Sequence, residues 1–212
     1  MERRIVYFEK PGPTNTEETL QLAAEEARRR GTKKVVVAST RGVTARAAAA
    51  VFAGTGVRLI VVPHQFGFTD TQRFPPDLVA QLERQGHKVH FGTMLFHTEN
   101  LYGVGAPETM ALTLRILCQG LKVCVEILLM VADAGLVTQG EEVIVVSGTG
   151  RGADTAVVAL SSTSNRLHDL HVTELICKPL QTRSWARGTS PYDPPEREPQ
   201  GKKIIDPWQV EQ

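Results

Sequence analysis

The sequence has few cysteines and little net charge, and each shortage excludes a class of protein. Its 212 residues include three cysteines and no C-x-x-C pair, which indicates reduced thiols in the cytoplasm. Lysine and arginine (24) nearly balance aspartate and glutamate (23), so the basic surface that non-specific nucleic-acid binding needs is missing. The opening residues, MERRIVYFEK, contain no apolar stretch of a secretory signal. We therefore expect a cytoplasmic protein with no nucleic-acid partner.

The most apolar stretch, LKVCVEILLMVADAGLV (121–137), is interrupted by Lys122, Glu126 and Asp133. Charges of this kind are rare in a membrane span, so no membrane partner is expected. Their spacings of four and seven place them on one face of a helix. We favour a buried Lys122–Glu126 ion pair there, with the alternative that Glu126 or Asp133 meets a polar edge of a ligand. Cys124, on the same helix, is expected to be a buried and unreactive thiol.

Strands and helices alternate along residues 1–182, which predicts an α/β domain with a mostly parallel sheet. The strands are continuous Val/Ile runs, as expected where helices cover both faces. Strands are expected at 4–8, 33–39, 58–63, 87–92, 143–147, 155–160 and 170–179. Helices are expected at 16–31, 44–53, 75–86, 107–119 and 121–134, with Gly120 separating the last two.

Residues 183–212 differ in composition from the rest of the chain. Five prolines and little periodicity predict a proline-rich extended tail. Its aromatic and aliphatic side chains, including Trp185 and Trp208, are candidates for anchoring the tail on a partner subunit. A homo-oligomer formed through the tail is therefore one expectation, and a loosely attached tail is the other.

A first polar loop follows the expected strand 33–39, in the stretch VVVASTRGVTA (35–45). Hydroxyls, a guanidinium and a glycine before a helix are the groups that hold a phosphate. A plainer interpretation makes Ser39 a strand end and Thr44 a helix N-cap. Even as an N-cap, Thr44 would leave helix amides pointing outward at an anion site.

A second polar loop lies in SGTGRGADTAVVAL (147–160) and has three interpretations. Its glycines match G-x-G-x-x-[GA], but that dinucleotide fingerprint must open a helix, and strand formers follow here. A tight hairpin turn explains the glycines but not Arg151, Asp154 and Thr155 beside them. We favour the third interpretation, in which backbone amides and Arg151 enclose an anion.

Other candidate groups follow the expected third and fourth strands. In PHQFGF (63–68), His64 and Phe66 are expected to cover a flat ring, or else Phe66 and Phe68 anchor the loop on the core. His97 and Tyr102 belong to a loop that is either a flap or a simple connection. The H-x-x-H pairs would place their rings on opposite faces of a strand, so no metal site is expected.

Four stretches together resemble a known family: YFEKPGPTNTEETL (7–20), VVVASTRGVTA (35–45), GLKVCVEILLMVADAG (120–135) and GTGRGADTAVV (148–158). They are similar to the C-terminal domain of pyruvate kinase, and more closely to small stand-alone relatives of that domain in archaea and bacteria. The resemblance covers about residues 1–180. It departs from the kinase at Thr40-Arg41-Gly42, where the kinase loop has a serine-glycine pair.

The resemblance implies a three-layer α/β/α sandwich with strand order 3-2-1-4-5 and strand 5 antiparallel. In the kinase the two loops hold the phosphates of a sugar-bisphosphate effector, and the stand-alone relatives are associated with flavin mononucleotide (FMN) without an established reaction. Kinase activity is not expected, because the kinase active site lies in other domains. The implied order places the strands ending at Ser39 and Ser147 side by side, which is the usual ligand crevice of such sheets.

The resulting hypothesis is a protein that binds a phosphorylated small molecule, with FMN as cofactor, at the carboxyl edge of its sheet. One alternative is a regulatory or interaction module that senses a sugar phosphate. A weaker alternative is a flavin-dependent oxidoreductase, for which His64, His97 and Tyr102 are the available proton donors. The expected ligand-binding residues are Lys10, Asn15, Thr16, Ser39, Thr40, Arg41, Gly42, Thr44, His64, Phe66, Glu126, Gly148, Thr149, Gly150, Arg151, Gly152, Asp154 and Thr155.

Overall fold

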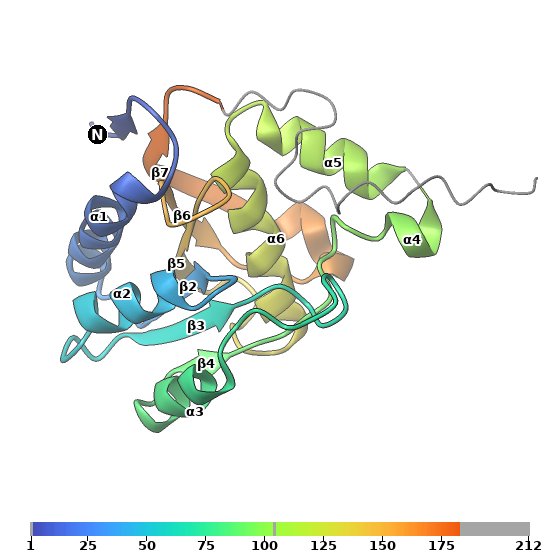
Figure 1. Cartoon of the computed structure of the whole chain (residues 1–212). Helices are drawn as coiled ribbons and strands as arrows, with labels where there is room; N and C mark the ends of the chain where they lie inside the picture. Colours follow the sequence, from blue (N-terminus) through green and yellow to red (C-terminus); the bar gives the residue numbers. More distant parts are fainter. Residues whose placement is uncertain (1, 104, 183–212) are drawn as a thin grey trace, which may run out of the picture.

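The structure, a computed structural model, describes residues 2–103 and 105–182, and these residues build a seven-stranded sheet (Figure 1). The predicted tail lies outside this part of the chain. Across the sheet the strands run in the order β1-β7-β6-β5-β2-β3-β4. Their bounds are β1 Val6–Phe8, β2 Lys34–Ala38, β3 Arg58–Val62, β4 Lys88–Val89, β5 Glu142–Ser147, β6 Thr155–Leu160 and β7 His171–Pro179.

The core of the sheet confirms the expected topology. Strands β4, β3, β2, β5 and β6 lie in the 3-2-1-4-5 order, and the fifth of them, β6, is antiparallel to its neighbour. The pairs β2–β3, β2–β5, β3–β4 and β1–β7 are parallel. Strands β7 and β1 extend the sheet beyond β6, with β6 and β7 antiparallel.

Helices cover both faces of the sheet, which makes three layers (Figure 1). Helices α1 (Thr16–Arg30), α2 (Val43–Val51) and α3 (Pro76–Arg84) pack on one face, and α6 (Gln119–Asp133) packs on the other. Helix α5 (Ala106–Arg115) packs on α6. The remaining elements are α4 (Glu99–Tyr102) and the 3-10 turns η1 (Pro13–Asn15) and η2 (Ser164–Asp169).

Side chains of the central strands alternate between the two cores. Val35 and Val37 of β2 contact the α1–α3 core, while Val36 contacts the α6 core, and all three are fully buried. The continuous Val/Ile runs are thus explained by burial on both faces. Burying each such side chain stabilises the folded state by about 1.5–3 kcal/mol. No helix in the described residues is long and apolar enough to cross a membrane.

Two local predictions are wrong. Gly120 does not separate two helices, because it lies inside the first turn of α6. The helix accepts it because a Cβ at Gly120 would lie 2.0 Å from Thr155 Oγ1, so α6 packs closely on β6 only with a glycine there. Thr44 is not the N-cap of α2, since the helix begins at Val43 and is capped at Gly42.

The topology brings five connections to one edge of the sheet, the carboxyl edge. These are the segments 9–15 after β1, 39–42 after β2, 63–75 after β3, 90–98 after β4, and 148–154 between β5 and β6. Each follows the carboxyl end of a strand that is parallel to β2 and β5 or, for β1, to β7. Most of the predicted ligand-binding residues belong to these segments.

Candidate functional site

The loop 148–154, here called the glycine loop, joins β5 to β6 as a hairpin, so no helix follows it. Gly150 and Gly152 have φ values of 81° and 70°, a conformation that favours glycine. A Cβ at Gly152 would lie 2.5 Å from Pro13 Cα, and a Cβ at Gly148 would lie 2.5 Å from the Gly152 carbonyl oxygen. The glycines therefore allow the loop to fold tightly on itself and on the segment after β1.

Asp154 holds the glycine loop in place. Its fully buried carboxylate accepts hydrogen bonds from the Gly12 amide (2.9 Å), the Thr149 amide (3.1 Å) and the Thr155 hydroxyl (2.8 Å). With three donors on one buried carboxylate, Asp154 fixes the position of the glycine loop. Thr155, also fully buried, belongs to the same hydrogen-bonded unit.

The segment after β1 is fixed by similar contacts. Thr16 Oγ1 accepts the Ala153 amide hydrogen (3.0 Å) and donates to the Pro13 carbonyl oxygen (2.7 Å). Asn15 Nδ2 donates to the Lys10 carbonyl oxygen (2.8 Å). Asn15 and Thr16 thus bind the protein itself, while the side chain of Lys10 is exposed at the same edge.

Two polar side chains of the glycine loop are not used to hold the loop together. Thr149 is 5% exposed, and its Oγ1 has no hydrogen-bond partner among the described residues. A buried hydroxyl without a partner costs stability, and this oxygen is itself covered by the protein. The guanidinium of Arg151 is exposed at the tip of the same loop.

The loop after β2 presents a helix N-terminus. Ser39 Oγ accepts the Ala45 amide hydrogen at 3.1 Å, so a side chain three residues before the Gly42 N-cap pairs one first-turn amide of α2. The amides of Val43 and Thr44 find no acceptor among the described residues. Free first-turn amides with a positive dipole end favour an anion.

Other residues of this loop differ in their exposure. Arg41 is exposed and Thr40 is half-buried, whereas the Thr44 side chain is buried. Gly42 has φ 81°, and a Cβ there would lie 2.5 Å from Leu78 Cδ2 of α3. Gly42 is therefore needed to turn the chain into α2 against α3.

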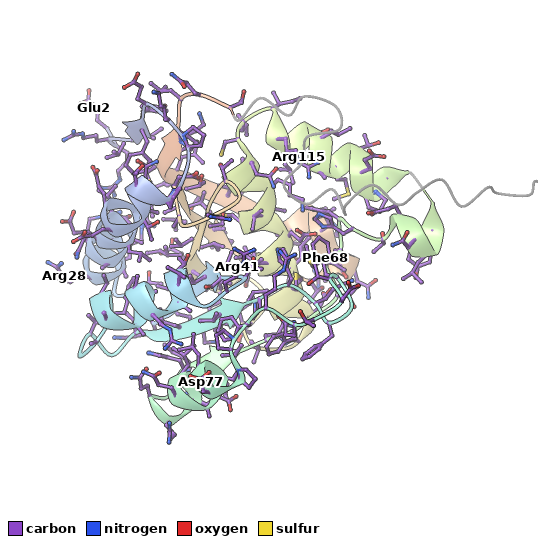
Figure 2. All side chains as sticks on the ribbon, viewed as in Figure 1. Glu2, Arg28, Arg41, Phe68, Asp77 and Arg115 are labelled. Carbon is purple, nitrogen blue, oxygen red and sulfur yellow. The ribbon has the colours of Figure 1, made fainter. Side chains whose placement is uncertain are left out.

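The two loops meet because β2 and β5 are neighbours, with Val37 paired to Val146. Parallel strands lie about 4.8 Å apart, so Ser39 and Ser147 end side by side as predicted. The strand order also reverses direction at this point, which marks the usual crevice of a doubly wound sheet. Figure 2 shows Arg41 at this edge, well away from Arg28 on the outside of α1.

Aromatic rings gather beyond β3. His64 lies 4.5 Å from Phe68, and Phe68 lies 5.6 Å from His97, both edge to face between ring centroids. Burial, followed by the neighbouring His97 and Arg73, lowers the pKa of His64 to about 4, so this ring is neutral at pH 7. Phe66, which was expected to lie beside His64 over a ring, is 67% exposed and contacts Phe91 instead.

A buried charged group adjoins these rings on α6. Lys122 Nζ lies 2.5 Å from Glu126 Oε2, which confirms the predicted ion pair. Glu126 Oε1 accepts the Phe96 amide hydrogen (2.8 Å) and lies 3.1 Å from His97 Nδ1. Burial alone would raise the pKa of Glu126, but the His97 hydrogen bond and the Lys122 charge hold it at about 2.

The contact between Glu126 and His97 was missed by sequence reasoning, although each residue was considered. The two are 29 positions apart, and the helix periodicity that linked Glu126 to Lys122 carries no information about a loop histidine. The available signal was the position of His97 after the fourth strand, since that strand also ends at the carboxyl edge.

The cysteines are buried thiols. Cys124 Sγ lies 3.2 Å from Ser147 Oγ, and burial raises the pKa of Cys124 far above its usual range. Burial also raises the pKa of Cys177 to about 12. Within residues 2–103 and 105–182, no group of three or more histidine, cysteine or acidic side chains is placed to hold a metal ion.

A cavity of about 550 Å³ lies away from these loops, between α5, α6 and β7. Its lining contains no charged side chain, so it offers no counter-ion to a phosphate. The cavity is lined by Ala106, Thr109, Met110, Thr113, Leu114, Val125, Leu167, Leu170 and Val172.

Comparison with known proteins identifies related chains. A family model described as the pyruvate kinase α/β domain matches residues 17–159, more than half of the chain and including both polar loops and α6. A crystal structure of a pyruvate kinase from Cryptosporidium parvum matches with a TM-score of 0.39 and 16% sequence identity. That match covers 72% of this chain and 24% of the kinase, so the chain spans about a quarter of the kinase's length.

Proposed function

The chain belongs to the family of the pyruvate kinase α/β domain, and from this premise and the loop geometry we propose that it binds a phosphorylated small molecule, FMN, at the carboxyl edge of the sheet. The phosphate lies between the loop after β2 and the glycine loop. No reaction is part of the proposal.

The observation that carries the proposal is the set of free donors on two neighbouring strands. The amides of Val43 and Thr44 and the hydroxyl of Thr149 have no partner among the described residues. Arg41 and Arg151 are exposed beside them and supply positive charge. Amides, hydroxyls and guanidinium groups are the donors that proteins usually present to a phosphate, and these come from loops on two neighbouring strands.

The residues present also fit the rest of FMN. The phosphate would be held by the N-terminus of α2 together with Arg41 and Arg151, and the ring would lie toward His64 and Phe68. Strands β5, β2 and β3 are adjacent, so the glycine loop and His64 are about 10 Å apart across the sheet. An extended ribityl chain spans a gap of this order. The bound flavin would supply a redox-active ring.

One observation favours a second candidate, a sugar bisphosphate that the protein senses as an effector. Two arginines, Arg41 and Arg151, come from separate loops, and a phosphate monoester needs only one of them for a bidentate contact. In this case the site would serve regulation, and partner binding would respond to the ligand.

The test begins with a visible absorption spectrum of the purified protein and of the supernatant after heat denaturation. Flavin bands released by denaturation would support FMN. Ligand-free protein is then titrated with FMN and with a sugar bisphosphate, using Arg41→Ala, Arg151→Ala and, as matched control, Arg28→Ala on the outside of α1. Loss of one charge-assisted contact should weaken binding about tenfold or more in the first two variants only. Equal affinity in all variants would refute the phosphate site.

A further inference from the structure

We infer that His97, aligned by the buried Lys122–Glu126 pair, forms with Phe68 and His64 a second subsite that binds the planar heterocycle at the far end of the phosphate ester. The inference relies on the proposed function for the position of the phosphate. The subsite itself is argued from contacts that do not involve the phosphate loops.

The imidazole of His97 has a fixed orientation. Its Nδ1 lies 3.1 Å from Glu126 Oε1, so Nδ1 carries a hydrogen that it donates to the carboxylate. The other nitrogen, Nε2, is directed away from Glu126, and the His97 side chain is 26% exposed. An aligned and reachable Nε2 can accept a hydrogen bond from a ligand N–H group.

Glu126 and Lys122 serve as positioning residues. The Glu126 carboxylate is 2% exposed and already receives hydrogen bonds from Phe96, His97 and Lys122. The Lys122 ammonium is fully buried and lies 2.5 Å from a Glu126 oxygen, 3.4 Å from His97 Nδ1 and 5.4 Å from the centroid of the Phe96 ring. Because Nδ1 donates to Glu126, it is no acceptor for Lys122. The pair therefore fixes His97 from within the helix, and His97 alone of the three reaches the surface.

The neighbouring rings determine which kind of ligand fits. Phe68 lies edge to face between His64 and His97, and His64 is uncharged at pH 7. Aromatic edges and faces with few charges suit a flat ring. A sugar needs several hydrogen-bond partners for its hydroxyls, whereas the group argued for this subsite is a single acceptor, His97 Nε2. A heterocycle with an imide-type N–H matches both the rings and Nε2.

The subsite lies within reach of the phosphate loops. Gly120, on the same helix as Glu126, packs on Thr155 at the end of the glycine loop. Glu126 lies six residues farther along α6, or about 9 Å at a helical rise of 1.5 Å per residue. One ligand can therefore place its phosphate at the glycine loop and its ring beside His97. Figure 2 shows Phe68 and Arg41 over the same edge of the sheet.

The experiment measures affinities of the full chain for FMN and for ribose 5-phosphate, which has the phosphate but no heterocycle. The variants are His97→Phe, which keeps a ring but no nitrogen, Phe68→Leu, and the matched control His168→Phe at a histidine that is 75% exposed. His97→Phe should weaken FMN binding about tenfold and leave ribose 5-phosphate within twofold. Arg151→Ala should lower the affinity for both ligands. Nitrogen-15 spectra of the imidazoles should show Nδ1-protonated His97 in the wild type and a loss of that preference in Glu126→Gln.

Each remaining outcome decides one claim. If His97→Phe and Phe68→Leu leave FMN affinity unchanged, or weaken both ligands equally, the subsite is refuted while the phosphate site stands. If neither phosphate ester binds the wild type, the proposed function fails, and riboflavin is then added. A shift of the His97 imidazole resonances with riboflavin, absent with ribose, would support the subsite by itself. The absence of any shift would overturn it.

Discussion

Lys122 Nζ and Glu126 Oε2 lie 2.5 Å apart on successive turns of α6, with the two residues 0% and 2% exposed. Removing two charges from water costs several kcal/mol each, which a buried ion pair recovers only with good geometry and further hydrogen bonds. Glu126 has those bonds from Phe96 and His97. The pair is therefore stable as a unit but sensitive to the loss of either member.

We expect Lys122→Met to lower the free energy of unfolding by about 3–5 kcal/mol, because it leaves the Glu126 carboxylate buried without a counter-charge. Glu126→Leu should lower the free energy of unfolding by a similar amount, because it leaves the Lys122 ammonium buried without a counter-charge. The double variant Lys122→Met/Glu126→Leu should be less destabilised than the sum of the single variants, since no unpaired charge remains. Urea denaturation at pH 7 measures the free energy of unfolding of the wild type, the two single variants and the double variant. Additive effects would contradict a coupled pair.

His64 should make stability depend on pH between about 6.5 and 4. Its pKa is lowered to about 4 in the folded protein, whereas an unfolded histidine titrates near 6.5. Within this window the unfolded state binds a proton that the folded state does not, so the free energy of unfolding falls as the pH falls. The total effect is on the order of 3 kcal/mol.

The measurement compares urea unfolding of the wild type, His64→Gln and the exposed-site control His168→Gln at pH 7, 5.5 and 4. Burial also lowers the pKa of His87 and His90, so only the difference between curves reports on His64. The free energy of unfolding should depend less on pH in His64→Gln than in the wild type, whereas His168→Gln should show the same pH dependence as the wild type. Parallel curves for all three proteins would contradict a neutral buried His64.

Gly120→Ala should destabilise the protein, although alanine normally favours a helix by about 0.5–1 kcal/mol over glycine. The new Cβ would lie 2.0 Å from Thr155 Oγ1 and 2.4 Å from Thr155 Cβ. Thr155 is fully buried and hydrogen-bonded to Asp154, so it cannot turn aside. We expect the free energy of unfolding, measured by thermal or urea denaturation, to fall by about 1–3 kcal/mol or more.

The matched control for this substitution is Gly105→Ala, where φ is −174° and no atom lies within 4 Å of the added Cβ. Its stability should change by no more than about 0.5 kcal/mol. A Gly120→Ala protein as stable as this control would show that α6 can move away from β6.

The strands could be predicted because both faces of the sheet are covered, which makes runs such as VVV (35–37) and VIVV (143–146) unmistakable. Their order in the sheet was predicted from the family resemblance, since the runs themselves do not say which strands are neighbours. The first turns of the helices were harder to predict from the sequence. Gly120 was interpreted as a helix break, since a glycine needed for close packing on Thr155 looks the same in a sequence as one that ends a helix. At α2, the N-cap residue is Gly42 rather than Thr44, and Ser39 pairs a first-turn amide because Gly42 turns the chain between Ser39 and the helix.

For the candidate site, sequence patterns identified what lies close along the chain, namely the two polar loops and the Lys122–Glu126 pair. They did not identify Asp154 as the residue that links the glycine loop to Gly12, or Glu126 as the partner of His97. These contacts join segments that only the sheet order brings together. The choice of Phe68 over Phe66 beside His64 depends on a loop conformation that no periodicity encodes.

The two outer strands of the sheet are very short, with three residues in β1 and two in β4. Between them lies the nine-residue β7, whose outer side is shielded by β1 along only part of its length. Unpaired strand edges are templates for edge-to-edge association, and short border strands are one protection against it. Strand β1 therefore covers the end of the β7 edge that lies at Cys177–Pro179, and without β1 this edge would be open to pairing with a strand of another molecule.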